Sequence, residues 1–555
     1  MDARRIVEFI DKNEIVFEEV NNGDSKLKAL YLLEETLKDG NWSPYFLTFF
    51  TLLSDKASTI LSVLSPTLLI TIGYFIFSRD EANLETFCAL GIAVTYYKLF
   101  HTGFVECIAE KVGITCSTQY GAKLYQGMTN SFFLGLAIQG LYLLLVTIPF
   151  FMWSAKFLGF FITSASMIQK ASDILHMCIP MAALQSFNIT LRSFLNSQGV
   201  EGVFTPFLLG NLVLSMFVGQ FFLQTLELGV PGWILFRVFY ELVGLATGMY
   251  LMFTKADPNT LGTFDKNLFL QTIKANSLDI VSFSACFALE GLGIELSIFF
   301  VAASGNLEDI AAYVAFMNFL RIILGIGKGL SVILRTRVNL LIGKRSQSTA
   351  ESFFWFFYTS TFIHSVFLGL LTLMFSTALP WLYTTNHDIH DVLAGMIFLS
   401  GWVLPLFLTL DSASTVLRSL WKTSTLILIY VFVLIFFNAV LGWNLLKRFK
   451  LGAFGLSCAC AFSIGMTNLC ILFSLSTTDW SLVETKFKEY NKFSELIRRL
   501  TVLKQTGEAR GDSLGVGPKQ GLRFSTNGVP VELFIVPSQE LADIEEPTRV
   551  RSNTL

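Results

Sequence analysis

Residues 282–301 read SFSACFALEGLGIELSIFFV, and this stretch decides the fold. A helix that crosses a bilayer needs about 20 predominantly apolar residues, and the stretch meets that length. It nevertheless carries two acids near its middle, Glu290 and Glu295. An ionisable side chain at that depth is costly unless it faces water or a partner, so it indicates a binding site or an internal ion pair. We favour a binding site, with a structural ion pair as the alternative.

The composition places the whole chain in a membrane. Hydrophobic residues make up 53% and charged residues only 15% of the 555 residues, whereas soluble proteins have about 25% charged residues. The excess of apolar side chains predicts an all-α, multi-pass membrane protein. The formal net charge of −2 gives no reason to expect a nucleic-acid partner. The eight cysteines form no spaced pattern, so we expect no disulfide framework, no metal site and no cofactor.

About twelve apolar segments of spanning length follow one another along the chain. They are roughly 45–78, 84–111, 124–153, 157–197, 203–226 and 231–254, then 268–303, 308–342, 352–376, 391–421, 424–446 and 452–476. The expected parts are a cytosolic tail (1–44), an N-lobe of helices 1–6 (45–254), a linker (255–267), a C-lobe of helices 7–12 (268–476), a basic amphipathic helix (477–507) and a disordered tail (508–555).

The two halves resemble each other. Leu-Arg-Ser at 191–193 follows Pro180 at nearly the distance at which Leu-Arg-Ser at 417–419 follows Pro405. Two lobes of the same orientation imply a pseudo-twofold axis along the membrane normal, with a binding site between them near mid-membrane. An even number of spans puts both termini on one side. If that side is the cytosol, the cytoplasmic loops hold most of the basic residues, among them Arg192 and Arg335. This distribution fits the positive-inside rule, so we expect both termini in the cytosol.

The acids within the C-lobe are the candidate ion-binding residues. Glu290 and Glu295 are five apart, about 140° round a helix, so they cannot line one face together, and we favour Glu290 for a central cavity. Asp411 lies in LPLFLTLDSASTVL, where neighbouring hydroxyl groups can solvate it. Because desolvation favours the neutral form of a carboxylic acid, Asp411 can load and release a proton.

The eighth predicted span carries three basic residues at steps of seven, Arg321, Lys328 and Arg335, so they lie nearly on one stripe. They either neutralise the buried acids Glu290, Glu295 or Asp411, or they contact an anionic substrate. We favour neutralisation, because a buried charge usually keeps a partner. Lys328 also stays a candidate substrate-binding residue. Gly325 and Gly329 beside it are expected to mark a close helix contact rather than a phosphate loop.

Two further groups of charges have simpler interpretations. Arg237 and Glu241 are four apart in the sixth predicted span, so we expect them to neutralise each other. Glu110 and Lys111 are expected to belong to a charge cluster at a helix end. A relay formed by Glu106, Glu110, Lys98 and His101 is the less favoured alternative for the second predicted span.

Five short stretches stand in order along the chain. They are TCSTQYGA at 115–122, LNSQG at 195–199, LEGLGIE at 289–295, TRVNLLIG at 336–343 and TDW at 478–480. Together they resemble the motifs TLCGQAYGA, LQAQG, LEWWxxE, TRVSNxLGAG and TDW of the multidrug and toxic compound extrusion (MATE) family of secondary transporters. Within them we single out Gly121, Gln198, Arg337 and Gly343 as motif residues.

The resemblance implies a twelve-helix, two-lobed antiporter that expels organic, often cationic, compounds in exchange for H+ or Na+. It also implies that Glu290 is the coupling acid of the seventh helix, with Glu295 as a second acid and Asp411 as the acid of the tenth helix. The chain departs from the family in four places. The acid at the end of the first helix in many prokaryotic members has no clear equivalent among residues 69–77, and the glycine-rich run after span ten is SLWK at 419–422. The two aromatic residues after the first glutamate are replaced, and Lys328 stands where the family is usually apolar.

We therefore predict a secondary active antiporter that exports organic compounds, cationic or amphiphilic, in exchange for H+ or Na+ by alternating access. A flippase for lipid-linked or amphiphilic molecules is the alternative. We expect no enzyme, because no hydrolase, kinase or metalloenzyme motif occurs. The expected partners are a small organic substrate, the coupling ion and the lipid bilayer, and the expected state is a monomer. The expected setting is the plasma membrane or an acidic organelle membrane.

Overall fold

The computed structural model describes residues 57–77, 84–260, 283–286, 288–343, 347–420, 422–478, 480, 521–526 and 529–534. The chain divides into two compact units, Met1–Lys488 and Glu489–Leu555. The helices described below belong to the first unit and the two strands to the second. The expected N-terminal tail and residues 481–507 of the expected amphipathic helix lie outside the described residues.

Six helical runs form the N-lobe. They are α4 (Ala57–Phe77); α5 (Leu84–Tyr97), η4 (Lys98–Thr102) and α6 (Gly103–Gly121); α7 (Tyr125–Tyr142), η5 (Leu143–Thr147) and α8 (Ile148–Met152); α9 (Ser154–Leu158), α10 (Ala165–Met177) and α11 (Ile179–Asn196); α12 (Glu201–Gln220) and η6 (Phe221–Thr225); and α13 (Gly229–Lys255) with η7 (Pro258–Thr260). Helices α10 and α11 meet at 50°. Pro180 stands in the first turn of α11, where proline begins a helix but cannot continue the one before it.

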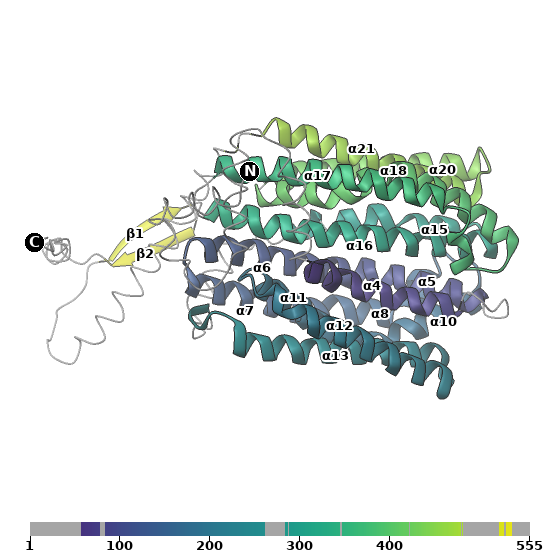
Figure 1. Ribbon diagram of the computed structural model, residues 1–555, viewed down its shortest axis with the longest axis horizontal. Helices are drawn as coiled ribbons and strands as arrows, with labels where there is room; N and C mark the ends of the chain where they lie inside the picture. Colours follow the sequence, from purple (N-terminus) through teal and green to yellow (C-terminus); the bar gives the residue numbers. More distant parts are fainter. Residues whose placement is uncertain are drawn as a thin grey trace, which may run out of the picture. The chain divides into compact units, whose positions relative to one another are not determined.

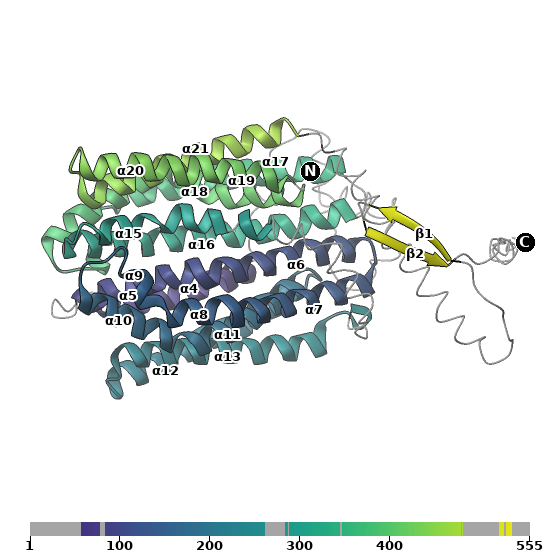
Figure 2. The same cartoon turned by 180° about the vertical axis from the view of Figure 1, so that it is seen from behind.

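Six further runs form the C-lobe. They are the span Phe283–Ala302, which ends in α15 (Ser297–Ala302); α16 (Leu307–Gly343); α17 (Gln347–Met374) with η8 (Leu379–Leu382); α18 (His387–Ser419); α19 (Thr423–Ile429), η9 (Tyr430–Phe437) and α20 (Asn438–Lys447); and α21 (Gly452–Ser476). Figure 1 shows the purple-to-teal N-lobe helices on one side of this unit and the green C-lobe helices on the other. Figure 2 shows the same division from behind.

The helices have the length and composition of membrane spans. Eight described helices are long and apolar enough to cross a membrane, and the bent pair α10 and α11 makes a ninth. Two shorter apolar helices lie within α4 and α12, and the charged run 84–121 completes the twelve. This confirms the predicted fold class, an all-α membrane protein of about twelve helices in two lobes.

Helix α16 lies at the centre of the unit. Its apolar window is 83% buried, the largest share among the described spans. A Cβ added to Gly329 would lie 2.7 Å from Cα of Ile60 on α4, and one added to Gly325 would lie 3.1 Å from Cδ1 of Leu64. The first distance is too short for a Cβ, and the second is tighter than most Cβ contacts, so the predicted helix contact at these two glycines is confirmed. Lys328 between them turns away from α4, into a cavity described below.

Replacing Gly329 with valine is expected to lower the stability of the protein by about 1–3 kcal/mol, because the added methyl groups meet backbone rather than a movable side chain. Thermal unfolding of the detergent-purified chain measures this effect. Gly140→Val is the matched control, because a Cβ there meets no atom within 4 Å. Equal losses in the two variants would contradict the close contact.

The second unit contains a hairpin where the sequence predicts disorder over 508–555. Strands β1 (Gly521–Thr526) and β2 (Val529–Phe534) pair antiparallel, with Leu522 opposite Leu533 and Arg523 opposite Glu532. The hairpin therefore departs from the expected disorder in these twelve residues.

Candidate functional site

Charged residues of the helical unit gather round one cavity of about 230 Å³. Helices α4, α5, α6, α10, α11 and α13 line it from the N-lobe, and the span Phe283–Ala302, α16 and α18 line it from the C-lobe. Its lining includes six acids and seven basic side chains, a formal charge of plus one when all are ionised. They are Glu106, Glu110, Glu241, Glu290, Glu295 and Asp411, with Lys98, Arg192, Arg237, Arg321, Lys328, Arg335 and Arg418.

The first cation of the α16 stripe, Arg321, forms an enclosed ion pair with Glu295. Its Nε donates to Oε1 of Glu295 at 3.1 Å, and its Nη2 donates to Oε2. Nη2 also donates to Oγ1 of Thr95 at 2.7 Å, and Nη1 donates to the hydroxyl of Tyr74 at 3.5 Å. Lys98 adds a longer contact, with Nζ 3.7 Å from Oε1 of Glu295. Thr95, Tyr74 and Lys98 belong to the N-lobe, so this pair joins the two lobes.

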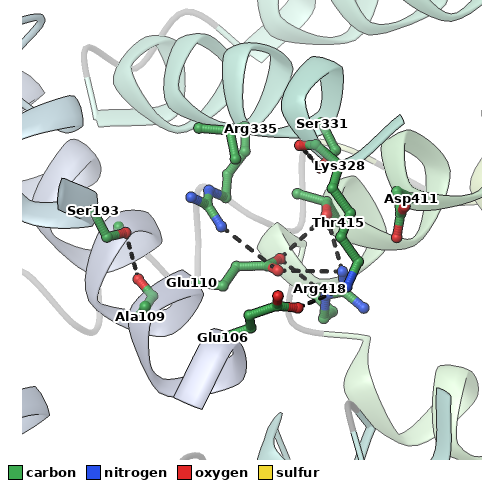
Figure 3. Close-up of polar contacts among 12 residues, drawn as sticks. Glu106, Ala109, Glu110, Ser193, Lys328, Ser331, Arg335, Asp411, Thr415 and Arg418 are labelled. Atoms are coloured by element: carbon green, nitrogen blue, oxygen red, sulfur yellow. Dashed lines mark hydrogen bonds and ion pairs between the residues drawn. The ribbon is translucent and has the colours of Figure 1, made fainter. Parts of the chain in front are cut away.

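The next two cations of the stripe pair with acids of α6. Nζ of Lys328 donates to Oε2 of Glu106 at 2.6 Å, and the side chains remain 36% and 30% exposed, which shows that this pair is wetted from the cavity. Nη1 of Arg335 lies 3.5 Å from Oε2 of Glu110. Figure 3 shows Glu106 and Glu110 facing α16 with both contacts drawn. Each cation of the stripe therefore has an acidic partner. Arg321 pairs with an acid that the neutralisation hypothesis names, whereas Lys328 and Arg335 pair with acids of α6 that it does not name.

Arg418 of α18 contacts an acid of each lobe. Its Nε donates to Oε1 of Glu110 at 3.0 Å, and its Nη1 donates to Oε2 of Glu290 at 3.0 Å. The side chain is only 1% exposed. Thr415 donates to Oε1 of Glu110 at 3.2 Å, and the hydroxyl of Tyr430 donates to Oε2 of Glu290 at 3.0 Å. A buried ion is stable only when its hydrogen bonds are satisfied. These contacts engage Glu110 through Oε1 and Glu290 through Oε2.

Asp411 lies two helical turns before Arg418 on the same face of α18. It is 4% exposed and lines the cavity, and its Oδ2 receives no hydrogen bond from the residues that the structure describes. Figure 3 shows it beside Lys328 and Thr415. The structure thus brings Glu290, Asp411 and Lys328 to one cavity. Glu295 lines the cavity too, although the helical spacing predicts that it faces elsewhere, because the cavity reaches round two sides of this helix.

Arg237 and Glu241 do not form the ion pair that their spacing predicts. Oε2 of Glu241 accepts a hydrogen bond from Nδ2 of Asn188 at 2.7 Å, and Oδ1 of Asn188 accepts one from Nε of Arg192 at 3.1 Å. The carboxylate is therefore held toward α11. The guanidinium of Arg237 lies 5.5 Å from the ring centroid of Trp233. It makes no hydrogen bond or ion pair with any residue in the described part of the chain.

Three other charges lie deeper than the sequence predicts. Glu110 is 8% exposed inside α6 and does not belong to a helix-end cluster with Lys111, whose Nζ lies over the ring of Phe283. Arg192 and Arg335, assigned from sequence to cytoplasmic loops, are buried within α11 and α16. The physical reason is clearest for α6, which continues to Gly121, well past the predicted end at residue 111.

Comparison with known families identifies the chain. The sequence matches the MatE family model over residues 87–221 and 286–444, which together make up more than half of the chain. The chain belongs to the MatE family. The twelve helices and the cavity between two lobes belong to that fold.

Solved structures of MATE proteins share the fold of this MatE chain. The eukaryotic MATE transporter AtDTX14 matches with a TM-score of 0.73 at 16% identity, covering 80% of this chain and 99% of that chain. A mutant of the Vibrio cholerae MATE transporter VcmN matches with a TM-score of 0.64 at 15% identity, covering 79% and 98%. An outward-facing multidrug resistance MATE family transporter of the MOP superfamily gives 0.63 at 14% identity, covering 79% and 96%. The search of curated proteins finds no match.

The MatE chain is therefore a multi-pass membrane transporter of a multidrug efflux family, and members of this family are transporters rather than enzymes. Its motif residues lie away from the cavity. Oε1 of Gln198 accepts from the backbone N–H of Asp257 at 3.0 Å and so holds the turn after α11 to the segment after α13. Gly121 ends α6, Gly343 ends α16, and Arg337 is half-buried in α16.

Sequence reasoning about this MatE chain missed Arg418 as a member of the site and kept Glu110 only in the less favoured relay of the second span. Arg418 entered only through the internal repeat, and Glu110 was assigned to a helix end. A signal for both was present, because each is an ionisable residue inside or at the edge of an apolar stretch. The same rule that selects Glu290 would have selected them.

Proposed function

We propose that this MatE chain is an H+-coupled antiporter that exports amphiphilic organic compounds through the cavity between its lobes by alternating access. The position of Arg418, which contacts Glu290 of the C-lobe and Glu110 of the N-lobe together, carries the proposal. A change in the charge of either acid changes how firmly Arg418 holds the lobes together. Protonation can therefore alter the balance between two lobe arrangements.

Glu290 carries the coupled proton in this proposal. When Glu290 is charged, Arg418 is shared between two carboxylates. When Glu290 is protonated, the attraction to its carboxyl group falls, and Arg418 is left to Glu110 on the opposite lobe. Transport is coupled because the protonated and deprotonated forms favour different lobe arrangements, and substrate binds those arrangements with different affinities.

The surroundings of Glu290 favour H+ over Na+, the alternative coupling ion. Its Oε2 already accepts hydrogen bonds from Arg418 and Tyr430, each at 3.0 Å. A proton needs a single lone pair of the carboxylate, whereas a metal cation needs several oxygen ligands and would be repelled by the adjacent guanidinium.

The charge of the cavity favours an amphiphilic over a purely cationic substrate. Among the acids that line it, Glu106, Glu110, Glu290 and Glu295 are paired with basic side chains. Asp411 has a buried oxygen that receives no hydrogen bond in the described part of the chain, and Glu241 is bonded to Asn188 rather than to a basic side chain. A bulky organic cation would therefore meet an excess of positive charge. We further propose a monomer with both termini in the cytosol, in the plasma membrane or an acidic organelle membrane.

Reconstitution into proteoliposomes tests the coupling. An imposed pH gradient is expected to drive accumulation of an amphiphilic dye, and a Na+ gradient of equal size is not. Asp411→Asn is expected to lower the pH-driven rate about 100-fold, the low end for loss of a proton-transfer group.

Asp391→Asn is the matched control, because Asp391 lies on the same helix with its side chain 85% exposed. Accumulation driven equally by Na+, or equal rates in the two variants, would contradict the proposal. Movement of a fluorescent phospholipid in place of the dye would favour the flippase alternative.

A further inference from the structure

The N-lobe wall of the cavity, formed by Tyr97, Gln185, Trp233 and Arg237, holds a buried cation that the proposed antiport cycle does not use. Arg237 is 2% exposed and lines the cavity. Its Nε is enclosed and makes no hydrogen bond, and no carboxylate of the described residues lies within ion-pair distance of its guanidinium. Every cation of the α16 stripe, by contrast, has an acid partner.

The nearest acid in sequence cannot compensate Arg237. Glu241 is one turn away, but Asn188 holds its carboxylate toward α11 at 2.7 Å. The ring of Trp233 lies 5.5 Å from the guanidinium and stabilises it by a cation–π contact. That contact is weaker than the penalty for removing an isolated cation from water. The arrangement therefore leaves a positive charge on this wall for an anion from outside the chain.

A neutral donor accompanies this charge on the same wall. The hydroxyl of Tyr97 donates to Oε1 of Gln185 at 2.6 Å, so the carboxamide is fixed by its oxygen. Its Nε2 donates to no residue that the structure describes, and Gln185 is only 4% exposed. An amide N–H and a guanidinium that line the same cavity form a donor set suited to oxyanions.

Apolar side chains of the N-lobe also line the cavity near this wall. Ile174, Cys178, Met181 and Ile189 line the cavity with the indole of Trp233. A substrate that places an oxyanion at Arg237 would therefore have an apolar body against these side chains. The cavity of about 230 Å³ suits a small organic molecule and not the paired acyl chains of a phospholipid.

We propose that the N-lobe wall binds the oxyanion group of an amphiphilic organic anion, a carboxylate, sulfonate or phosphate, with Arg237 as its counter-ion and Gln185 as a second donor. This inference rests on the proposed exporter function and specifies its substrate class. In one cavity, the C-lobe acids then carry the coupling proton and the N-lobe wall selects the substrate.

Binding of two probes with the same body tests the proposal. Naphthalene sulfonate and naphthylmethylammonium are titrated calorimetrically into the full-length chain in detergent. Wild type is expected to bind the sulfonate more tightly than the ammonium ion. Arg237→Gln is expected to weaken sulfonate binding at least about tenfold, as for loss of a charged hydrogen-bond donor, and to leave or improve ammonium binding. Arg237→Lys is expected to keep part of the sulfonate affinity.

Lys255→Gln is the matched control, because Lys255 lies exposed at the end of the same helix, α13. Sulfonate affinity that is unchanged in Arg237→Gln, or equal loss for both probes, would overturn the assignment. If Arg237→Gln does not fold, the preference of the wild-type chain between the two probes still tests the anion site. Tighter binding of the ammonium ion than of the sulfonate would overturn the assignment. Displacement of the sulfonate by a short-chain phosphatidylglycerol at equal concentration would assign the wall to a lipid headgroup instead.

The outcome is separable from that of the proposed function. A wild-type chain that binds the ammonium probe and still moves it under a pH gradient would overturn the anion site and leave the antiporter standing. A chain that binds the sulfonate but transports nothing under a pH gradient would leave the site standing and overturn the antiporter.

Discussion

Replacing Arg418 with methionine is expected to abolish pH-gradient-driven transport and to lower the stability of the protein by about 3–5 kcal/mol, the cost of breaking a buried ion pair by removing one partner. The change leaves Glu110 and Glu290 buried without the guanidinium to which both are bonded at 3.0 Å. Arg335 remains for Glu110, but only at 3.5 Å. Thermal unfolding in detergent and dye accumulation in proteoliposomes measure the two effects.

A triple variant separates the loss of stability from the loss of coupling. Adding Glu110→Gln and Glu290→Gln to Arg418→Met removes the uncompensated charges, so stability is expected to return most of the way while coupled transport stays absent. Arg448→Met, at an exposed site outside the cavity, serves as the control. Wild-type stability in Arg418→Met alone would show that the guanidinium does not hold the two acids.

Glu290→Gln is expected to abolish efflux driven by a pH gradient, with a loss of at least about 100-fold, while the protein stays folded in the membrane. The carboxamide oxygen of glutamine can still accept from Arg418 and from Tyr430, so the contacts at this position are preserved. What is lost is a group that can release a proton. Dye accumulation in proteoliposomes at several imposed pH gradients measures the effect.

Exchange of labelled for unlabelled substrate without any ion gradient is the internal control for Glu290→Gln. This exchange is expected to survive, because it needs binding and lobe movement but no net proton release. Glu308→Gln, at an exposed position in the first turn of α16, controls for the substitution itself. Full pH-driven efflux in Glu290→Gln would reject the coupling role.

The acids of the seventh span could be found from sequence because the free-energy cost of an ionisable side chain depends on its depth in the membrane. A carboxylate in the middle of an apolar stretch is unusual wherever its neighbours lie. Its partners could not be found in this way. Arg418 is 128 residues from Glu290 and 308 from Glu110 along the chain, and only the packing of α18 against both lobes brings them together.

Helix boundaries explain other differences between sequence and structure. Glu110 was assigned to a helix end because the apolar pattern fades near residue 111, yet the chain stays helical to Gly121. Arg237 and Glu241 satisfied the spacing rule for an ion pair, but a tertiary hydrogen bond from Asn188 took the carboxylate. In the hairpin, Asn527 and Gly528 between the two strands were a turn signal available from sequence, outweighed by the polar composition of the tail.

The tight approach of α16 to α4 at Gly329 limits how the lobes can move. The contact is beside Lys328, and Arg321 and Arg335 lie on either side of it along α16, the farther one about 12 Å away by helix rise. If the lobes rock about this point, the contacts of Arg321 with Thr95 lengthen when those of Arg335 with Glu110 shorten. The two ends of α16 then move in opposite directions about Gly329, and the passage cannot open at both ends together.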